Sequence, residues 1–483
     1  MAAAPWAGVP SNEQFFVLLT GANSGVGQGI CQRLIDDFLA TRSLSAHLVL
    51  IPTTRSPQKS RETIDSLRAY LAKAARTSTK LRSRASSDYD PESAVARVHL
   101  LAVEVDLCKL PSIYDAAAKL LGGQVRDPTG NVAGGQDLQI PKLDAVLFNA
   151  GYGGWDGIRW FEFARQFFTV GLVQSTTFPS FKSSQAGHIL PLQEVPGNKS
   201  EDEDGAGQPR LAEVFCANTF GHYVLAHELM PLLTRSDPSE PAARVVFTSS
   251  IDAEERHLDL DDFQGFKSTA AYESSKRITD LMCLTSELPS VQAVSSSFFG
   301  SGAPSSSRKY TKKPRLYLSH PGIVCTPLFP LNAFMFFFYY YAMLLSRLLG
   351  SPWHGVDPYI GACATVWLAL EDEATLDASH AQRVKWGSAA DRHGRADPKK
   401  TEVEGWGWEG KVEDAEALKR DEASGVLRKL TGRKWDAVQL TEEKRAKFEE
   451  DGVRCWKELE ALRGRWEEIM GRRPNSAEKV GQA

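Results

Sequence analysis

The stretch that most constrains the fold of this chain is Phe15 to Ile30, which reads FFVLLTGANSGVGQGI. Its first five residues are apolar, as is typical of a buried parallel strand. A turn containing Gly21, Gly25 and Gly27 follows, and helical periodicity then continues to Phe38. Glycines let the backbone approach a pyrophosphate, and the free N–H groups at a helix start bind its charge. The stretch therefore predicts a dinucleotide-binding unit at the start of an α/β domain.

The glycine spacing is G-x-x-x-G-x-G, whereas G-x-G-x-x-G is the commoner form. The same spacing also occurs in tight strand-to-helix turns that bind nothing, but the flanking strand and helix favour the binding interpretation. The candidate cofactor-binding residues in this stretch are Thr20, Gly21, Ser24, Gly25, Val26 and Gly27.

The overall composition excludes several classes of protein. The chain has 483 residues, and its net charge of −4 gives no sign of a nucleic-acid-binding surface. Its seven cysteines are scattered singly, which predicts reduced thiols and neither a zinc site nor a disulfide framework. The N-terminus lacks the basic start and apolar core of a signal peptide. We expect one large cytosol-facing α/β domain with insertions.

The segment after the second expected strand, 47–51, indicates which nicotinamide cofactor is used. NAD-binding units usually place an acidic residue here to hold the ribose 2′-hydroxyl. Residues 41–59 contain no acid but carry Arg42, Arg55 and Lys59. Cations suit a 2′-phosphate, and an arginine can hold it with two parallel hydrogen bonds. The sequence thus predicts NADPH, with Arg55 as the leading contact and Lys59 next; solvated surface cations are the alternative.

Two further strands are expected to end at the cofactor. The third, 98–105, is followed by Asp106 and Leu107, which could flank the adenine; alternatively, Asp106 caps the next helix. The fourth, 143–148, ends in Asn149-Ala150-Gly151.

The second half of the expected domain supplies polar residues at the same edge. The helix predicted over 211–233 carries Asn218 on its apolar face, an unusual choice unless the residue has a role. The fifth strand, 244–250, ends in Ser249 and Ser250. Tyr272 and Lys276, four residues apart, share one helix face. A lysine cation favours the phenolate and lowers the tyrosine pKa, so that the phenol can deliver a proton to a carbonyl oxygen.

This ordered set resembles the motifs of the short-chain dehydrogenases/reductases. The resemblance implies that Ser250, with Ser249 as second choice, binds the substrate carbonyl and that Tyr272 donates the proton. It also implies that Lys276 binds the nicotinamide ribose and tunes Tyr272, while Asn218 supports a water in the proton relay. In one respect the chain departs from the family: Tyr272 follows Ser250 by 22 residues instead of about a dozen, which predicts an extra loop beside the site.

The same resemblance assigns two more cofactor contacts. It implies that Asn149, Ala150 and Gly151 stabilise the sheet and border the cofactor. It also implies that the loop after the sixth strand, 315–320, holds the nicotinamide. In this loop Pro321 and Gly322 come first, the backbone near Ile323 binds the amide, and Thr326 bonds the cofactor.

The segment 328–350 distinguishes this chain from a plain dehydrogenase core. Its uninterrupted apolar run, Ala333 to Leu345, has thirteen residues, which suggests an interfacial or buried helix and is too short to span a bilayer. Its dense tyrosines and phenylalanines suit the lipid–water boundary. Our hypothesis is a monotopic lid that admits a lipid-soluble substrate, with a core helix as the alternative. For a second aromatic patch, 155–168, core packing is the favoured interpretation over membrane contact.

The predicted fold is a Rossmann-like doubly wound parallel sheet with inserted loops, an aromatic membrane-facing segment and a C-terminal helical extension. The expected organisation is an N-terminal tail at 1–14, a core at 15–327 with loop insertions near 152–210 and 284–313, the apolar segment 328–350, and a packing helix and charged helical extension at 351–483. An amphipathic helix over 441–470 is expected to pack on its own domain or on a partner.

Several stretches, among them 215–228, 246–252, 258–264, 272–281 and 319–326, resemble the 3-keto-steroid reductases of sterol C-4 demethylation. The resemblance implies NADPH-dependent reduction of a sterol C3 ketone on the cytosolic face of the endoplasmic reticulum, or on lipid droplets, beside the C-4 methyl oxidase and C-4 decarboxylase. Two alternatives stay open. One is a reductase of another bulky carbonyl, such as a 17-ketosteroid or a retinoid, and the other is a scaffold protein with a vestigial site.

Overall fold

A nine-stranded sheet forms the centre of the computed structural model, which describes residues 3–84, 89–195, 208–300, 311–326, 331–412 and 432–472. The strand order is β11-β10-β9-β8-β5-β1-β2-β3, and β4 also pairs with β2. The pairs are parallel except for β10 with β11. The strands are β1 Gln14–Thr20, β2 His47–Thr54, β3 Val98–Leu100, β4 Val103–Glu104, β5 Ala145–Phe148, β8 Arg244–Thr248, β9 Arg315–His320, β10 Lys385–Ala390 and β11 Ala396–Thr401.

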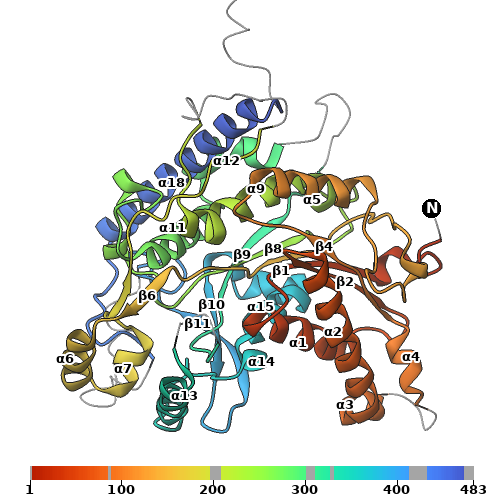
Figure 1. The fold of residues 1–483 in the computed structure, drawn as a ribbon, viewed down its shortest axis with the longest axis horizontal. Helices are drawn as coiled ribbons and strands as arrows, with labels where there is room; N and C mark the ends of the chain where they lie inside the picture. The colour runs from red at the N-terminus through yellow and green to blue at the C-terminus, as the bar shows by residue number, and fades with distance from the viewer. Residues whose placement is uncertain are drawn as a thin grey trace, which may run out of the picture.

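Helices cover both faces of this sheet (Figure 1). Successive residues of β1 enter opposite cores: Phe16 and Leu18 join one buried cluster, and Val17 and Leu19 join the other. The first core is closed by α5 Leu110–Gly122, α9 Gly221–Glu228 and α11 Ala271–Thr285, and the second by α1 Gly25–Thr41, α2 Pro57–Thr77 and α15 Cys363–Leu370. The predicted doubly wound α/β fold is confirmed.

The strand order reverses between β1 and β5. From β1 the chain builds outward through β2 to β3, and it then returns to place β5 and β8 on the other side of β1. In open α/β sheets, ligands bind at such a reversal, outside the carboxyl ends of the strands. The glycine turn after β1 and the Asn-Ala-Gly motif after β5 both lie at this edge.

The core extends beyond the boundaries expected from the sequence. Trp6, in the expected tail, is buried, and its ring packs edge-on against Phe16 at 5.7 Å. In the expected helical extension, β10 adds a fully buried strand beside β9. This strand reads KWGSAA, so its small and basic residues do not show the apolar pattern on which strand prediction depends.

The C-terminal helix α18, Glu442–Ile469, packs on its own domain, as one of the two alternatives predicted. Thr441 caps it by accepting a hydrogen bond from the N–H of Lys444. Its apolar stripe lies against α11 and against α12, Pro289–Gly300. The second expected loop insertion, near 284–313, is therefore partly a packed helix; residues 301–310 of it lie outside the described part of the chain.

The insertion after β5 forms a hairpin and two helices. Strands β6, Trp155–Ile158, and β7, Lys182–Ser184, are antiparallel, and α6, Trp160–Val170, and α7, Leu172–Thr177, lie between them in the sequence. Figure 1 shows α6 and α7 at the lower left, on the same side of the molecule as α13, Ala333–Leu348. The prediction that this aromatic patch packs in a core is wrong for α6, because the exposed fraction is 80% at Phe161 and 85% at Phe168.

The remaining elements are short connections. They include α3 Thr79–Arg84, α4 Pro91–Val95, α8 Glu213–Phe215, the π-helix Cys216–Phe220, α10 Met230–Leu233, α14 Pro358–Gly361 and α16 Glu373–Ala378. Within the described ranges, none of the helices has both the length and the hydropathy that crossing a bilayer requires.

Candidate active site

The glycine turn between β1 and α1 has the geometry of a phosphate cradle. Gly21 has φ +70° and Gly25 has φ +53°, left-handed conformations that favour glycine. A Cβ on Gly27 would lie 2.0 Å from the carbonyl oxygen of Gly21, so this position also excludes any side chain. The turn leads directly into the N-terminus of α1, where free backbone N–H groups can bind an anion.

Thr20 and Asn149 join the ends of β1 and β5. The Thr20 hydroxyl oxygen accepts hydrogen bonds from the N–H groups of Asn149 and Ala150, at 3.0 and 3.1 Å. In return, the Asn149 side-chain amide donates to the carbonyl oxygens of Thr20 and Gly21, at 3.3 and 3.4 Å. These bonds fix the two strand ends on either side of the crevice.

A cavity of about 530 Å³ follows this edge of the sheet. The predicted site residues that line it are Thr20, Gly21, Ser24, Gly25, Val26, Gly27, Arg55, Asp106, Leu107, Asn149, Ala150, Gly151, Ser249, Tyr272, Lys276, Pro321 and Thr326. Residues from the start, middle and end of the core therefore meet in one space, as the ordered motifs require. The lining fits a dinucleotide. It includes both a glycine turn at a helix N-terminus, which suits the pyrophosphate, and the pair Tyr272 and Lys276.

Three predicted cofactor contacts lie elsewhere. Lys59 is in the first turn of α2, away from the lining residues, and Gly322 and Ile323 also do not line the cavity. The N–H of Ile323 donates to Trp353 at 2.7 Å, and its carbonyl oxygen accepts from Val356 at 3.0 Å. The Ile323 N–H is therefore already engaged, whereas its carbonyl oxygen, which has two lone pairs, can accept one more hydrogen bond.

Arg55 and Arg42, two of the cations in residues 41–59, lie in different places relative to the cavity. Arg55 is exposed at the carboxyl end of β2 and lines the cavity. Among the residues described, it makes no ion pair. Arg42, by contrast, donates to the carbonyl oxygen of Leu370 and lies over the ring of Phe15, on another part of the surface.

Asp106 and Leu107 lie beside the cavity as predicted. One carboxylate oxygen of Asp106 accepts from the N–H of Cys108 at 3.1 Å, and the N-cap of α5 is Lys109. The alternative role of Asp106 as the cap of that helix therefore does not hold.

Asn218 lies in a π-helical segment of the helix predicted over 211–233. Such one-turn bulges occur often at functional sites. Its side chain is almost completely used: the oxygen accepts from the N–H of Tyr152, and the amide donates to Tyr152 and to the hydroxyl of Ser275. Asn218 thus ties the Asn-Ala-Gly segment to the helix that carries Tyr272 and Lys276.

The structure distinguishes the two serines at the end of β8. Ser249 is buried, and its hydroxyl donates to the Asp280 carboxylate at 2.5 Å. Ser250 is partly exposed, and its side chain forms a hydrogen bond with Tyr272. Ser249 lines the 530 Å³ cavity and Ser250 does not, but of the two only Ser250 forms a hydrogen bond with Tyr272.

Tyr272 and Lys276 lie at the start of α11, on the cavity side. The Lys276 ammonium donates to the carbonyl oxygen of Thr248 at 2.8 Å and lies 5.6 Å from the centre of the Tyr272 ring. Burial lowers the pKa of Lys276 to about 8. Burial also raises the pKa of Tyr272 to about 12, against the opposing effects of Lys182 and of the hydrogen bond from Ser250. The sequence predicts that the lysine brings this pKa below its ordinary value, but in the structure desolvation is the larger effect and the pKa is raised.

Sequence reasoning missed two neighbours of Tyr272, Trp155 and Lys182, both from the β6–β7 hairpin. The Trp155 and Tyr272 rings are 4.7 Å apart, and the Lys182 ammonium is 5.6 Å from the Tyr272 ring centre. No motif marks either residue, since both lie in the insertion near 152–210, and only the three-dimensional structure brings them to the site.

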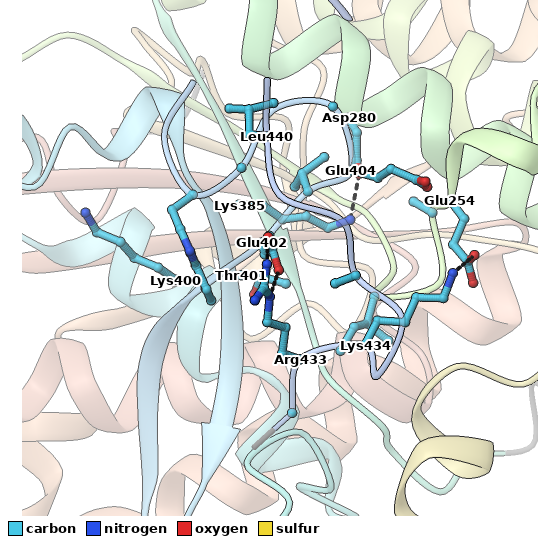
Figure 2. Close-up of a pocket in the computed structure, with 18 of the residues that line it drawn as sticks. Glu254, Asp280, Lys385, Lys400, Thr401, Glu402, Glu404, Arg433, Lys434 and Leu440 are labelled. Carbon is cyan, nitrogen blue, oxygen red and sulfur yellow. Dashed lines mark hydrogen bonds and ion pairs between the residues drawn. The ribbon is translucent and has the colours of Figure 1, made fainter. Parts of the chain in front are cut away.

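A larger cavity, of about 690 Å³, lies on the far side of Asp280 (Figure 2). Its charged lining is largely engaged in ion pairs, as Figure 2 shows for Lys385 with Asp280, Arg433 with Glu402 and Lys434 with Glu254. Asp280 therefore binds Ser249 on one side and Lys385 on the other.

Comparison with known proteins gives two close relatives over nearly the whole chain. The 3-keto-steroid reductase of Gibberella zeae is 50% identical over 472 residues, which cover 97% of this chain and 98% of the relative. That of Aspergillus fumigatus is 40% identical over 467 residues, 94% of each chain. No protein-family model matches. Among solved structures, a short-chain type dehydrogenase/reductase from Mycobacterium ulcerans aligns over 80% of this chain and 92% of its own, with a TM-score of 0.37 and 14% identity.

Proposed function

The chain belongs to the family of 3-keto-steroid reductases, and on that premise we propose that it reduces the C3 ketone of a 4-demethylated sterol to the 3β-hydroxysterol, with NADPH as the reductant. It is an oxidoreductase that uses NAD(P). The observation that carries the proposal is the convergence of Tyr272, Lys276 and the Gly21–Gly27 turn on one cavity, with Ser250 hydrogen-bonded to Tyr272.

The dinucleotide would lie along the carboxyl edge of the sheet. The turn from Gly21 to Gly27 and the N-terminus of α1 would bind its pyrophosphate, and Lys276 would bind the nicotinamide ribose. Arg55 would hold the 2′-phosphate. When bound, the cofactor supplies a hydride to the carbonyl carbon.

Residues of the chain donate the proton to the substrate and replace it afterwards. Because the pKa of Tyr272 is about 12, the phenol carries its proton at neutral pH and can donate it to the C3 oxygen as negative charge develops there. Ser250 donates a hydrogen bond to the same oxygen. Lys276, with a pKa of about 8, is mostly cationic at pH 7 and favours the phenolate that proton transfer leaves behind. Asn218 would support the relay that returns a proton to this pair.

The direct test is NADPH consumption by the full-length chain in detergent or liposomes, with a panel of ketones. We expect turnover with a 4-demethylated 3-ketosterol and at least tenfold lower kcat/KM with a 17-ketosteroid or a retinoid aldehyde. Preference for either of the latter would replace the substrate assignment. No consumption with any carbonyl, alongside normal NADPH binding, would favour the scaffold alternative.

Arg55→Ala is expected to change the choice of cofactor. Losing a charged contact to the 2′-phosphate should weaken NADPH binding by roughly 10–100-fold, in line with about 1.5–3 kcal/mol for hydrogen bonds to charged groups. NADH has no phosphate there, so its binding should change little. The measurement is the Kd of each cofactor by fluorescence titration.

Two matched variants sharpen the result. Arg61→Ala removes an exposed cation near the start of α2 that does not line the cavity, and this variant should behave like the wild type. Lys59→Ala tests the second candidate. If Lys59→Ala alone changes the NADPH-to-NADH preference, the 2′-phosphate is held by α2 and the role of Arg55 is refuted.

We further propose that the protein works on a membrane surface, at the endoplasmic reticulum or on lipid droplets. The outer face of α13 exposes Phe334, Phe337, Phe338, Tyr341, Leu345 and Leu348 to solvent, each at least 48% exposed. Burying such aromatic and aliphatic residues in a lipid interface is favourable. Phe161 and Phe168 are also exposed on α6, which lies on the same side of the molecule as α13 (Figure 1).

The opposite face of α13 supports a lid role. Tyr339 is half-buried there and forms a hydrogen bond with Cys325 in the loop that leads to Thr326. Burial raises the pKa of Tyr339, and the nearby Lys182 ammonium partly offsets this rise. The helix thus connects an exposed apolar face to the loop 321–326, which contributes Pro321 and Thr326 to the cavity. This position is suited to passing a sterol from lipid to the site.

Cations stand beside the end of α13. A Cβ on Gly394 would lie 3.5 Å from Arg347, and one on Gly350 would lie 3.2 Å from Arg392. Arg392 and Arg395 are exposed on the β10–β11 turn. These charges complement anionic headgroups. Since decarboxylation at C-4 supplies the ketone, we propose that the C-4 methyl oxidase and decarboxylase work at the same surface.

A further inference from the structure

The β6–β7 hairpin places a second ammonium group at the proton donor. The Lys182 nitrogen lies 4.7 Å from the centre of the Trp155 ring and 5.6 Å from the centre of the Tyr272 ring. Lys276, on the helix of Tyr272 itself, lies at the same 5.6 Å. The phenol therefore has two cations within reach, and only Lys276 belongs to the motif Tyr-x-x-x-Lys.

Lys182 also joins the two elements that carry the catalytic hydroxyls. It pairs with Glu273, the residue after Tyr272, at 2.5 Å, and with Asp252, two residues after Ser250. Both carboxylate side chains are only 5% exposed, and that of Lys182 is 12% exposed. Such a buried arrangement is costly to disrupt, because removing one partner leaves an uncompensated charge.

The cluster keeps Lys182 charged. Burial disfavours the ammonium, but the attraction of Asp252 and then of Glu273 outweighs it and raises the pKa of Lys182. Burial raises the pKa of Asp252 to about 6, although Lys182 opposes this. Lys182 also lowers the pKa of Glu273 below its ordinary value despite burial. Around neutral pH the cluster thus presents one cation and two carboxylates to Tyr272.

We propose, on the basis of the reductase function above, that Lys182 is a positioning residue for Tyr272 and that it stabilises the phenolate formed when the proton leaves. In that step the O–H bond of Tyr272 breaks, a new O–H bond forms on the substrate oxygen, and the negative charge stays on the phenol oxygen. An ammonium at this distance favours the charged product. Asp252 and Glu273 reduce this stabilisation of the phenolate by Lys182, and they hold the Lys182 ammonium in place.

The charges around Tyr272 come from several elements. They are Lys182 on β7, Asp252 and Glu254 after β8, His257 in the following turn, and Glu273 and Lys276 on α11. Of these, Glu273 and Asp252 raise the pKa of Tyr272 and Lys182 lowers it, which allows a test with opposite signs.

The kinetic test uses oxidation of a 3β-hydroxysterol by NADP⁺, where Tyr272 must first lose its proton. In Lys182→Met the loss of the cation should raise the tyrosine pKa, so the acidic limb of the rate profile, where the rate rises with pH, should move up by on the order of one pH unit. Glu273→Gln removes an anion and should move the same limb down. Lys182→Arg keeps the charge and should keep the wild-type midpoint, with unchanged Kd for NADPH in all three variants.

A role in stability alone would lower Tm and overall activity without moving the midpoint, and this result in Lys182→Met would overturn the proposal. If that variant does not fold, a Glu273→Gln midpoint that is unchanged or higher would also overturn it. Titration of the Tyr272 ζ carbon by ¹³C NMR, assigned with Tyr272→Phe, gives the same comparison without turnover. A wild type that reduces no ketone would therefore refute the proposed function while the NMR shifts still decide the role of Lys182.

Discussion

Tyr272→Phe is expected to reduce turnover by roughly 10²–10⁴-fold, the usual contribution of a positioned proton donor, while NADPH binding stays near that of the wild type. The substitution removes only the hydroxyl. The ring would keep its packing against Trp155 at 4.7 Å and its place above the start of α11. Ser250 and Lys276 would remain, but neither could supply the proton: the serine is a weak acid, and the lysine is turned toward Thr248.

The measurement pairs single-turnover kinetics with a binding titration. Tyr70→Phe is a suitable control, because it too removes one hydrogen-bonded phenol hydroxyl, but Tyr70 is on α2, does not line the cavity and donates to Asp36. It should retain full activity. If Tyr272→Phe keeps more than about a tenth of wild-type turnover, another group is the proton donor and the assignment fails.

The parts of the site that could be predicted from the sequence are those fixed by backbone geometry. Gly27 has no space for a Cβ, and Asn149 is tied to the glycine turn through its amide. Constraints of this kind allow only one residue type at a position, so they can be recognised in the sequence. Strands β1, β2, β5, β8 and β9 could also be predicted, because each is a short apolar run buried in a parallel sheet.

The parts that could not be predicted depend on long-range packing. β10 is a strand because β9 and β11 supply its hydrogen bonds, and its own residues, including Gly387 and Ser388, have little strand preference. The pKa of Tyr272 depends on how deeply the phenol is buried, which the spacing of Tyr272 and Lys276 does not reveal. Lys182 reaches the site from an insertion without a motif.

The aromatic patch on α6 shows a further limit. Aromatic residues at helical spacing fit a core and a lipid interface equally well, so the sequence pattern did not distinguish them. Exposure distinguishes them here: Phe161 and Phe168 face solvent on α6, as Phe334 and Phe338 do on α13. Large apolar patches are rare on soluble surfaces and mark sites of interaction.

Replacing Phe334, Phe337, Phe338 and Tyr341 together by serine is therefore expected to abolish binding to lipid vesicles. Burying one large apolar side chain contributes about 1.5–3 kcal/mol, so the loss of four should weaken partitioning by on the order of 10³-fold or more. The fold should survive, because all four are at least 52% exposed, whereas Met343 and Ser346 hold the inner face of α13. Sedimentation with vesicles of mixed neutral and anionic lipid measures the effect.

Two comparisons make this membrane test decisive. Leu44→Ser with Val438→Ser removes exposed apolar residues outside α6 and α13, at 55% and 67% exposure, and should leave vesicle binding unchanged. Arg392→Gln with Arg395→Gln should weaken binding to anionic vesicles and leave binding to neutral vesicles largely intact, since each nearby cation contributes about 1 kcal/mol at a charged surface. The fourfold variant should keep its kcat/KM on a ketone presented in detergent and lose it on a ketosterol presented in vesicles. If it pellets with vesicles as the wild type does, α13 is not the membrane contact, and the sterol must reach Tyr272 by another path.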